Sequence, residues 1–368
     1  SVKGYKEIEF EVMRDASDRA ITICGMENID PVGVHTGDSV VVAPIMTLND
    51  HDLKMLNDSA IKILRTLKIQ GGCNVQFALN PKTSEYYLIE INPRVSRSSA
   101  LASKASGYPI ARVTAKVAVG MNLDEIAVAN TTAAFEPQLD YVVAKLPRFP
   151  FDKFSSAANT LGTQMKATGE VMGIGATLEE CLLKSIRSLE IGADHLWLPK
   201  FQNKTKEELL DYLRQFRDDG YFAIAQLMRL GVSTEEIFAV TMITPFFLEK
   251  LRGIVDMEET LRQHKNDGEI LRRAKEMGFS DPAIAKLWGV SEKIVYALRE
   301  EKGIFPKFKM VDTCHTGAYI PYFYSSYTGE NDSIRTDKKK IVVLGAGPIR
   351  IGQGVEFDYS TVHAVNTI

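Results

Sequence analysis

Two short runs of the sequence carry residue types that hold divalent cations and phosphate groups. The first is Asn74-Val75-Gln76-Phe77 and the second is Glu90-Ile91-Asn92-Pro93-Arg94. In a β-strand alternate residues share a face, so Gln76 lies with Asn74, and Glu90 with Asn92. One carboxylate and several amide oxygens are hard ligands that suit Mg²⁺ or Mn²⁺, with nucleotide phosphates supplying the remaining negative charge.

The residues between these runs predict that they form a hairpin. The segment 80–85, with Asn, Pro and Ser, has the composition of a tight loop, and it separates strands predicted over 74–79 and 86–92. In that hairpin Gln76, Glu90 and Asn92 converge on one face. The other face of the second strand is predicted to point into a core, with Tyr87, Ile89 and Ile91.

Two arginines follow the second strand directly. Arg94 and Arg97 offer planar guanidinium groups to phosphate or carboxylate oxygens. They favour a phosphate-handling site over the alternative, which is an amphipathic hairpin with a solvated polar face.

A glycine-containing loop is a second candidate for ligand contact. Gly33-Val34-His35-Thr36-Gly37-Asp38-Ser39 lies between strands predicted over 22–26 and 40–43. Its glycines permit close backbone approach to a ligand, and the backbone amides of such turns suit anions. The preceding Glu27-Asn28-Ile29-Asp30 adds oxygens for a second cation. Taken alone the loop does not identify a ligand, because a loop histidine is often only exposed.

The elements that position these residues change character along the chain. In the strand over 7–12, Glu7, Glu9 and Glu11 share one face. Apolar spacing predicts a helix over 51–67, with a stripe of Leu53, Leu56, Ala60, Ile63, Leu64 and Leu67. Further helices are predicted at 97–107 and 109–120, and strands at 141–145 and 170–173. From 195 to 330 helix follows helix, and a buried-type strand is predicted over 340–344.

Composition excludes several classes of protein. The 368 residues carry a net charge of -3, which does not suggest nucleic-acid or acidic-membrane partners. The four cysteines form no CxxC pair, so neither a disulfide framework nor a zinc site is expected, and a reducing cytosol fits best. There is no 18-residue apolar run and no signal-peptide segment. Both ends look cut, so we expect the natural protein to continue.

Two motifs suggest other functions and are disfavoured. Residues 269–302 mimic a DNA-binding helix-turn-helix, but their seven Lys and Arg residues face six Asp and Glu residues, too few unopposed cations for DNA. The glycines Gly345, Gly347 and Gly352 follow a predicted strand, but their spacing is GxGxxxxG and not the dinucleotide-binding GxGxxG.

The motifs together resemble the first ATP-grasp domain of the carbamoyl phosphate synthetase large chain. The resemblance covers essentially the whole chain, and its most specific run is Asn92-Pro93-Arg94-Val95-Ser96-Arg97-Ser98-Ser99-Ala100, continuing to Lys104. The ENPR-type signature alone fits any ATP-grasp enzyme. The alternative within enzymes, another ATP-grasp carboxylase or ligase, lacks the Val95–Lys104 run and the helical region that leads to a second α/β unit.

The resemblance implies ATP, Mg²⁺ or Mn²⁺, and K⁺ as cofactors. Glu7 would hold the ribose hydroxyls of ATP, and Gly33, Val34, His35, Gln76 and Glu90 would contribute to the nucleotide site. Gln76 and Glu90 would bind one divalent ion, and Glu90 with Asn92 the other. The K⁺ ligands would be Glu7, Asn28, Asp30, Val34 and Ser39. Arg94 and Arg97 would be catalytic, facing the carboxyphosphate made from bicarbonate.

The resemblance also implies a fold and partners. The fold would be an α+β ATP-grasp lobe, mostly antiparallel sheet with flanking helices, over 1–194; an all-α oligomerisation domain over 195–331; and a short α/β pre-ATP-grasp segment over 332–368. The full cytoplasmic enzyme would make carbamoyl phosphate from bicarbonate, two ATP and ammonia that a small glutaminase subunit releases from glutamine. The large chain would self-associate through its helices, with no nucleic-acid or membrane partner. The family's small ATP-clamping lobe is absent, so the isolated chain is expected to be nearly inactive.

Overall fold

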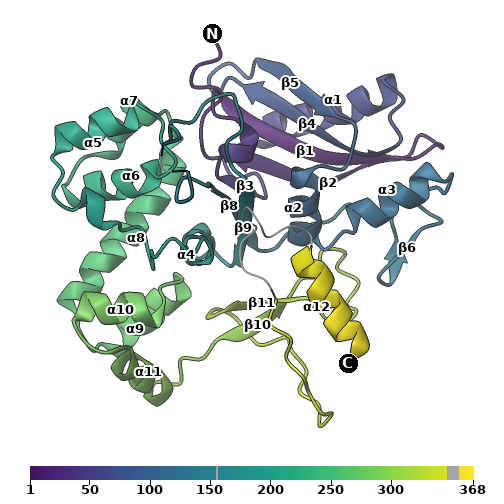
Figure 1. Ribbon diagram of the computed structural model, residues 1–368. Coiled ribbons are helices and arrows are strands. Elements are labelled where there is room, and N and C mark those ends of the chain that lie inside the picture. The colour runs from purple at the N-terminus through teal and green to yellow at the C-terminus, as the bar shows by residue number, and fades with distance from the viewer. Residues whose placement is uncertain (155, 346–355) are drawn as a thin grey trace.

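A seven-stranded, entirely antiparallel sheet forms the first part of the molecule (Figure 1). The computed structural model describes residues 1–154, 156–345 and 356–368. In spatial order the strands are β5 (Tyr86–Asn92), β4 (Gly71–Leu79), β1 (Lys6–Arg14), β2 (Ala20–Asn28), β3 (Val41–Ala43), β8 (Val142–Arg148) and β9 (Gly169–Gly175). The hairpin predicted over 74–92 is therefore confirmed as β4 and β5.

Helices cover both faces of this sheet. The helix α1 (Asp50–Thr66) packs against β1, β2 and β4, and its buried Leu56, Ala60 and Leu64 join Ile8 and Phe10 in one apolar cluster. The opposite face is covered by α2 (Arg97–Ser106) and α3 (Ile110–Ala118). A two-strand ribbon, β6 (Ala127–Val128) and β7 (Thr131–Thr132), follows α3.

A helical region lies to one side of the sheet (Figure 1). It is reached through α4 (Leu178–Ser188), which packs on β8 and β9. Its helices are α5 (Lys206–Leu213), α6 (Gly220–Arg229), α7 (Thr234–Thr241), α8 (Pro245–Gln263), α9 (Gly268–Glu276), α10 (Asp281–Trp288) and α11 (Glu292–Glu301). These elements confirm the predicted class, an α+β lobe followed by a helical region.

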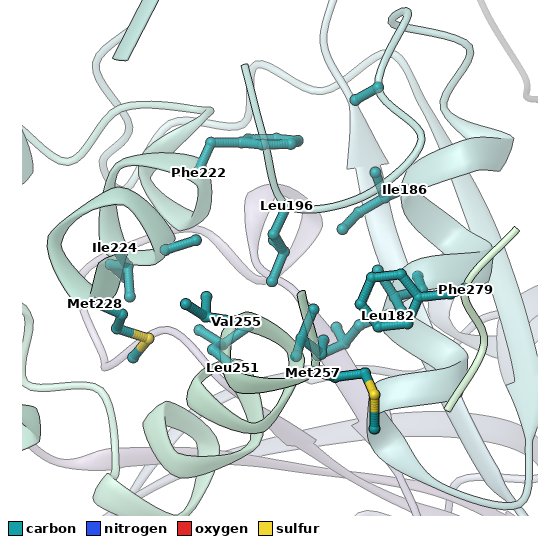
Figure 2. Close-up of a cluster of buried hydrophobic side chains, with 14 of the residues drawn as sticks. Leu182, Ile186, Leu196, Phe222, Ile224, Met228, Leu251, Val255, Met257 and Phe279 are labelled. Carbon is teal, nitrogen blue, oxygen red and sulfur yellow. The ribbon is translucent and has the colours of Figure 1, made fainter. Parts of the chain in front are cut away.

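One apolar core joins the sheet to the helical region. It begins at Val42 and Ala144 in the sheet, passes through Leu182 and Ile186 of α4, and continues into α6 and α8. Figure 2 shows Leu182 and Ile186 in the same cluster as Leu251 of α8. The predicted boundary between residues 194 and 195 therefore falls within a continuous core, and the boundary itself stays a prediction.

Two predictions about the core are wrong. Tyr87 and Ile89 were predicted to face a core, but their exposed fractions are 48% and 43%. The reason is topological: β5 is the edge strand, and α1 covers β1, β2 and β4 instead. Of the three residues predicted to face a core, Ile91 alone packs against the α1 cluster, where Tyr86 of the same strand joins it.

The C-terminal part differs from prediction in two ways. The helices end at Glu301, and 302–331 contains the hairpin β10 (Lys307–Met310) and β11 (Phe323–Ser326), whose aromatic residues favour strand. No strand forms over 340–344, because within the described residues nothing pairs with this segment. The helix α12 (Glu356–Thr367) follows. Gly347 and Gly352 of the glycine motif lie outside the described residues.

A buried histidine, to which no role was predicted, connects elements of the helical region. His195 Nδ1 lies 2.6 Å from Glu258 Oε1, and both side chains are buried. Arg229 of α6 donates two hydrogen bonds to the same carboxylate, at 2.9 and 2.8 Å. Glu258 of α8 therefore fixes α6 and the segment before α5 together.

Candidate functional site

A row of buried acids on β1 organises the polar face of the sheet. Glu7, Glu9 and Glu11 alternate along the strand and are at most 4% exposed. Across the strands, Glu9 pairs with Gln76, and Gln76 pairs with Glu90. Directly opposed residues in antiparallel strands have Cβ atoms about 5 Å apart, so these three side chains are neighbours. The strand register alone thus brings together residues far apart in the sequence.

The polar face opens into a cavity of about 310 Å³. It collects the predicted divalent-cation ligands with one predicted arginine and the loop histidine: His35, Gln76, Glu90, Asn92 and Arg94 all line it. Its other lining residues are Glu9, Met26, Thr36, Gly37, Val41, Ser96, Ser98, Leu101, Lys145, Met165 and Glu170.

The predicted divalent-cation ligands keep oxygen atoms available. Gln76 donates from Nε2 to Asn74 Oδ1 at 2.9 Å, and Asn92 donates from Nδ2 to Glu90 Oε1 at 2.6 Å. Within the described part of the chain, no donor reaches Gln76 Oε1 or Glu90 Oε2. The described residues hold no cluster of three His, Cys, Asp or Glu side chains suited to a metal. A cation here would therefore need amide oxygens beside Glu90, and the donors present fit Mg²⁺ or Mn²⁺.

Burial shifts the protonation of two acids in the row. Burial, followed by the charges of Glu9, Asp30 and Glu90, raises the pKa of Glu7 to about 8. Burial also raises the pKa of Glu11 to about 8, although hydrogen bonds from Ser99 and Asn74 oppose the shift. A cation beside Glu7 would favour its ionised form.

One of the predicted K⁺ ligands, Asn28, has an unsatisfied oxygen. Asn28 is buried and donates from Nδ2 to Thr36 Oγ1 at 3.3 Å, while its Oδ1 is buried with no hydrogen-bond partner in the described structure. Asp30 Oδ2 accepts a hydrogen bond from Val40 N at 2.9 Å, and burial raises the pKa of Asp30. The buried Ser39 donates to the His35 carbonyl at 3.3 Å. A carbonyl oxygen left without a donor in a buried site suits a cation.

The residues predicted for the nucleotide separate into two places. His35 lines the polar cavity, and its Nδ1 accepts a hydrogen bond from Gly37 N at 2.9 Å. Val34 instead lines a mostly apolar cavity of about 90 Å³, together with Asp30 and Tyr221. Gly33 is not among the residues that line either cavity; its φ of +125° requires glycine, and open space surrounds it.

The structure describes the side chain of one of the two predicted catalytic arginines, Arg94. Arg94 is exposed, lines the cavity and donates to Asn92 Oδ1 at 3.4 Å. Arg97 begins α2, but its side chain lies outside the described residues.

Several residues at the cavity were missed by sequence reasoning. Lys145 and Glu170 come from β8 and β9, which reach the site only through long-range strand pairing. Thr36 donates to Glu9 in a short hydrogen bond. For Lys145 a signal existed, since it is a lone charged residue within the apolar run Val142-Val143-Ala144-Lys145-Leu146.

Family models match three successive parts of the chain. The ATP binding domain of the carbamoyl-phosphate synthase L chain matches residues 1–126. The oligomerisation domain of the carbamoyl-phosphate synthetase large chain matches 170–303, and the carbamoyl phosphate synthase preATP-grasp domain matches 337–368.

These matches place the chain among ATP-binding synthases. All three models describe parts of one kind of polypeptide, in the order 1–126, 170–303 and 337–368. The chain belongs to the carbamoyl-phosphate synthase large-chain family.

Solved structures similar to parts of this chain are carboxylases. A biotin carboxylase from Campylobacter jejuni is 18% identical, with a TM-score of 0.33 over 40% of this chain and 30% of that chain. A pyruvate carboxylase from Rhizobium etli is 16% identical, with a TM-score of 0.33 over 40% of this chain and 13% of that one. The biotin carboxylase subunit of a pyruvate carboxylase is 13% identical, with a TM-score of 0.39 over 51% of this chain and 46% of the other. The chain thus spans less than half of each.

Among the described residues, no helix is both long and apolar enough to cross a membrane.

Proposed function

We propose that this chain carries the metal- and phosphate-binding part of an ATP-grasp site that phosphorylates bicarbonate. One observation carries the proposal: Gln76, Glu90 and Asn92 meet Arg94 and His35 in a single cavity. In the whole enzyme, an ATP-dependent ligase, ammonia would then attack the carboxyphosphate to give carbamate. A second ATP would convert carbamate to carbamoyl phosphate.

This cavity would have to position the phosphate groups and neutralise their negative charge. Phosphoryl transfer needs little covalent participation from the protein. Arg94 would orient an anionic oxygen, and the buried acids would set the site's negative potential. Gln76, Glu90 and Asn92 would hold Mg²⁺ or Mn²⁺, which when bound supplies positive charge to the phosphates. Asn28, with its unsatisfied buried oxygen, would hold K⁺ together with Glu7, Asp30, Val34 and Ser39.

The proposal extends to partners that the family resemblance implies. We infer that a small glutaminase subunit supplies ammonia in the cytosol, and that the large chain self-associates through α5–α11. Alone, the chain should turn over little, because the resemblance puts other ATP-clamping residues outside residues 1–368. A carboxylase-type ligase is the rival within ATP-grasp enzymes, and the three matches to one large chain disfavour it.

We do not expect nucleic acid to bind the helices of 269–302. Three of the seven cations of this segment form ion pairs with Asp281 or Asp194: Lys275 and Arg299 both contact Asp281, at 2.7 and 3.1 Å, and Lys286 contacts Asp194. Counterion release requires cations free to meet phosphates.

Replacing Glu90 by Gln tests the proposed metal site. Loss of the only carboxylate among the three ligands should weaken Mn²⁺ binding in the presence of ADP by about tenfold or more, which corresponds to about 1.4 kcal/mol. The measurement is the paramagnetic relaxation of water protons during a Mn²⁺ titration. The matched control is Glu85→Gln, which removes a carboxylate from the same hairpin outside the cavity. Equal Mn²⁺ affinity in both variants would count against the proposal.

A further inference from the structure

A buried lysine of β8 lies within the wall of the polar cavity. Lys145 is 3% exposed and pairs with Val41 of β3 and Met172 of β9. Its neighbours along the strand are buried and apolar, Ala144 and Leu146, so the ammonium has no packing advantage over an aliphatic side chain. A buried cation in this place must be compensated by hydrogen-bond acceptors or by a negative charge.

The ammonium of Lys145 has fewer partners than donors. Its Nζ donates to the Thr36 carbonyl at 3.0 Å and, more weakly, to the Gly37 carbonyl at 3.5 Å. Within the described residues no carboxylate oxygen lies inside salt-bridge distance of it. A lysine ammonium has three N–H donors, so at least one remains for a group in the cavity.

The charges around Lys145 are close enough to act at a distance but do not contact it. Burial lowers the pKa of Lys145, and the charges of Glu170, Glu9, Asp30 and Asp38 oppose that shift. A buried charge without a contacting counter-ion is costly. An anionic oxygen in the cavity would provide that missing contact.

We propose that Lys145 is a third cation of this site and holds an anionic oxygen of the bound ligand, of the phosphate or carboxyphosphate class. Its remaining donors fix the carbonyls of Thr36 and Gly37, and so hold the loop that carries His35 against the sheet. The proposal rests on the proposed function, in which the cavity receives phosphate groups. Arg94 contacts the ligand from an exposed position, whereas Lys145 acts as a point charge from a buried one.

The test compares charge with hydrogen bonding at position 145. Lys145→Gln removes the charge but keeps two N–H donors, and Lys145→Arg keeps the charge. Lys82→Gln, on the exposed hairpin loop, removes a lysine charge outside the cavity. The probe is inorganic tripolyphosphate with Mg²⁺, and its affinity is measured by ³¹P NMR titration. Hydrogen exchange of the Thr36–Ser39 amides reports separately on the loop.

The expected result is a selective loss of anion affinity. Lys145→Gln should weaken tripolyphosphate binding by about tenfold, as loss of a charge-assisted hydrogen bond does, with loop exchange nearly unchanged. Lys145→Arg should restore most of the affinity, and Lys82→Gln should leave it unchanged. The proposal is overturned if the Lys145→Gln variant binds tripolyphosphate as tightly as the unsubstituted chain. It is also overturned if the variant loses affinity and the Thr36–Ser39 amides exchange faster to the same extent.

Glu90→Gln, measured with the same probe, separates this proposal from the proposed function. If Glu90→Gln weakens Mg²⁺-dependent binding and Lys145→Gln does not, only the role of Lys145 fails. If the unsubstituted chain does not bind tripolyphosphate at all, the proposed function fails and the role of Lys145 fails with it.

Discussion

The three glutamates of β1 are unusual because all of them are buried. A strand with a polar face usually presents that face to water, but Glu7, Glu9 and Glu11 are buried beneath α2 and the loop around Thr36. Glu9 and Glu11 share the side-chain amide of Asn74, which donates 3.1 Å hydrogen bonds to both. Such carboxylates are costly to ionise unless cations approach them.

Glu11 should make folding stability depend on pH. Its folded pKa of about 8 lies above the ordinary value of 4.5, so its stabilising contribution is complete below 4.5 and is lost as pH rises toward 8. Glu11→Gln removes this titration and should gain stability relative to the unsubstituted chain across that window, by on the order of a few kcal/mol. Urea unfolding at pH 5, 6.5 and 8 measures it. A difference between the two proteins that stays constant with pH would contradict it.

The sequence predicts which residues come together when neighbouring strands pair. It misses residues that reach the cavity through strands paired over long sequence separations. Gln76 and Glu90 were predictable because a short loop joins their strands, and the loop chemistry is local. Lys145 stands out in the sequence as a lone charge in an apolar run, but its place at the cavity was not predictable, since β8 reaches the site by pairing with β3, across more than one hundred residues of sequence. The structure brings Gln76, Glu90, Asn92 and Arg94 into one cavity, and the roles of all the predicted ligands stay predictions.

At the scale of elements, α1 shows how far hydrophobic spacing can be trusted. The predicted stripe is real, but its members differ in depth: Leu56, Ala60 and Leu64 are fully buried, whereas Leu67 is 56% exposed. The spacing of apolar residues identifies which face of a helix packs against the sheet. It does not reveal where along the helix that contact ends, because this depends on the extent of the neighbouring sheet. The same limit explains β5, whose edge position no alternation pattern reveals.

Two leucines of α1 offer a matched pair of substitutions. Leu64→Ala should lower the free energy of unfolding by about 2–5 kcal/mol, because it leaves a cavity against β1 and β4. Leu67→Ala, at the exposed end of the helix, should cost about 0.5 kcal/mol. Urea denaturation followed by circular dichroism compares them. Similar losses in both variants would show that the sheet does not shield α1 as described.

At the scale of the whole molecule, one buried carboxylate ties the helical region together. Glu258 is inaccessible to solvent and accepts hydrogen bonds from Arg229 and His195. Burial alone would raise the pKa of Glu258, but these partners lower it overall. Its contribution to stability is therefore present above its ordinary pKa and lost as pH falls through its lowered folded pKa.

Removing that carboxylate should destabilise the helical region. Glu258→Ala leaves Arg229 buried without a counter-charge, and should lower the free energy of unfolding by about 3–5 kcal/mol. The control is Glu259→Ala, whose side chain is 58% exposed, and it should be nearly neutral. Thermal unfolding at pH 7 measures both variants. A Glu258→Ala protein as stable as its control would refute the structural role assigned to the network.

The core that runs from β3 and β8 through α4 into α6 and α8 also decides where the gene can be divided. A cut at residue 194 would strip Leu182 and Ile186 of their partners and leave each half with a bare apolar surface. We therefore expect each half to aggregate when it is expressed alone, and the two halves to form a soluble complex when they are mixed. Fusion junctions and linkers are better placed in the exposed segment 334–342, because Ile304 and Val311, which follow the last helix of this region, are still part of the buried apolar clusters.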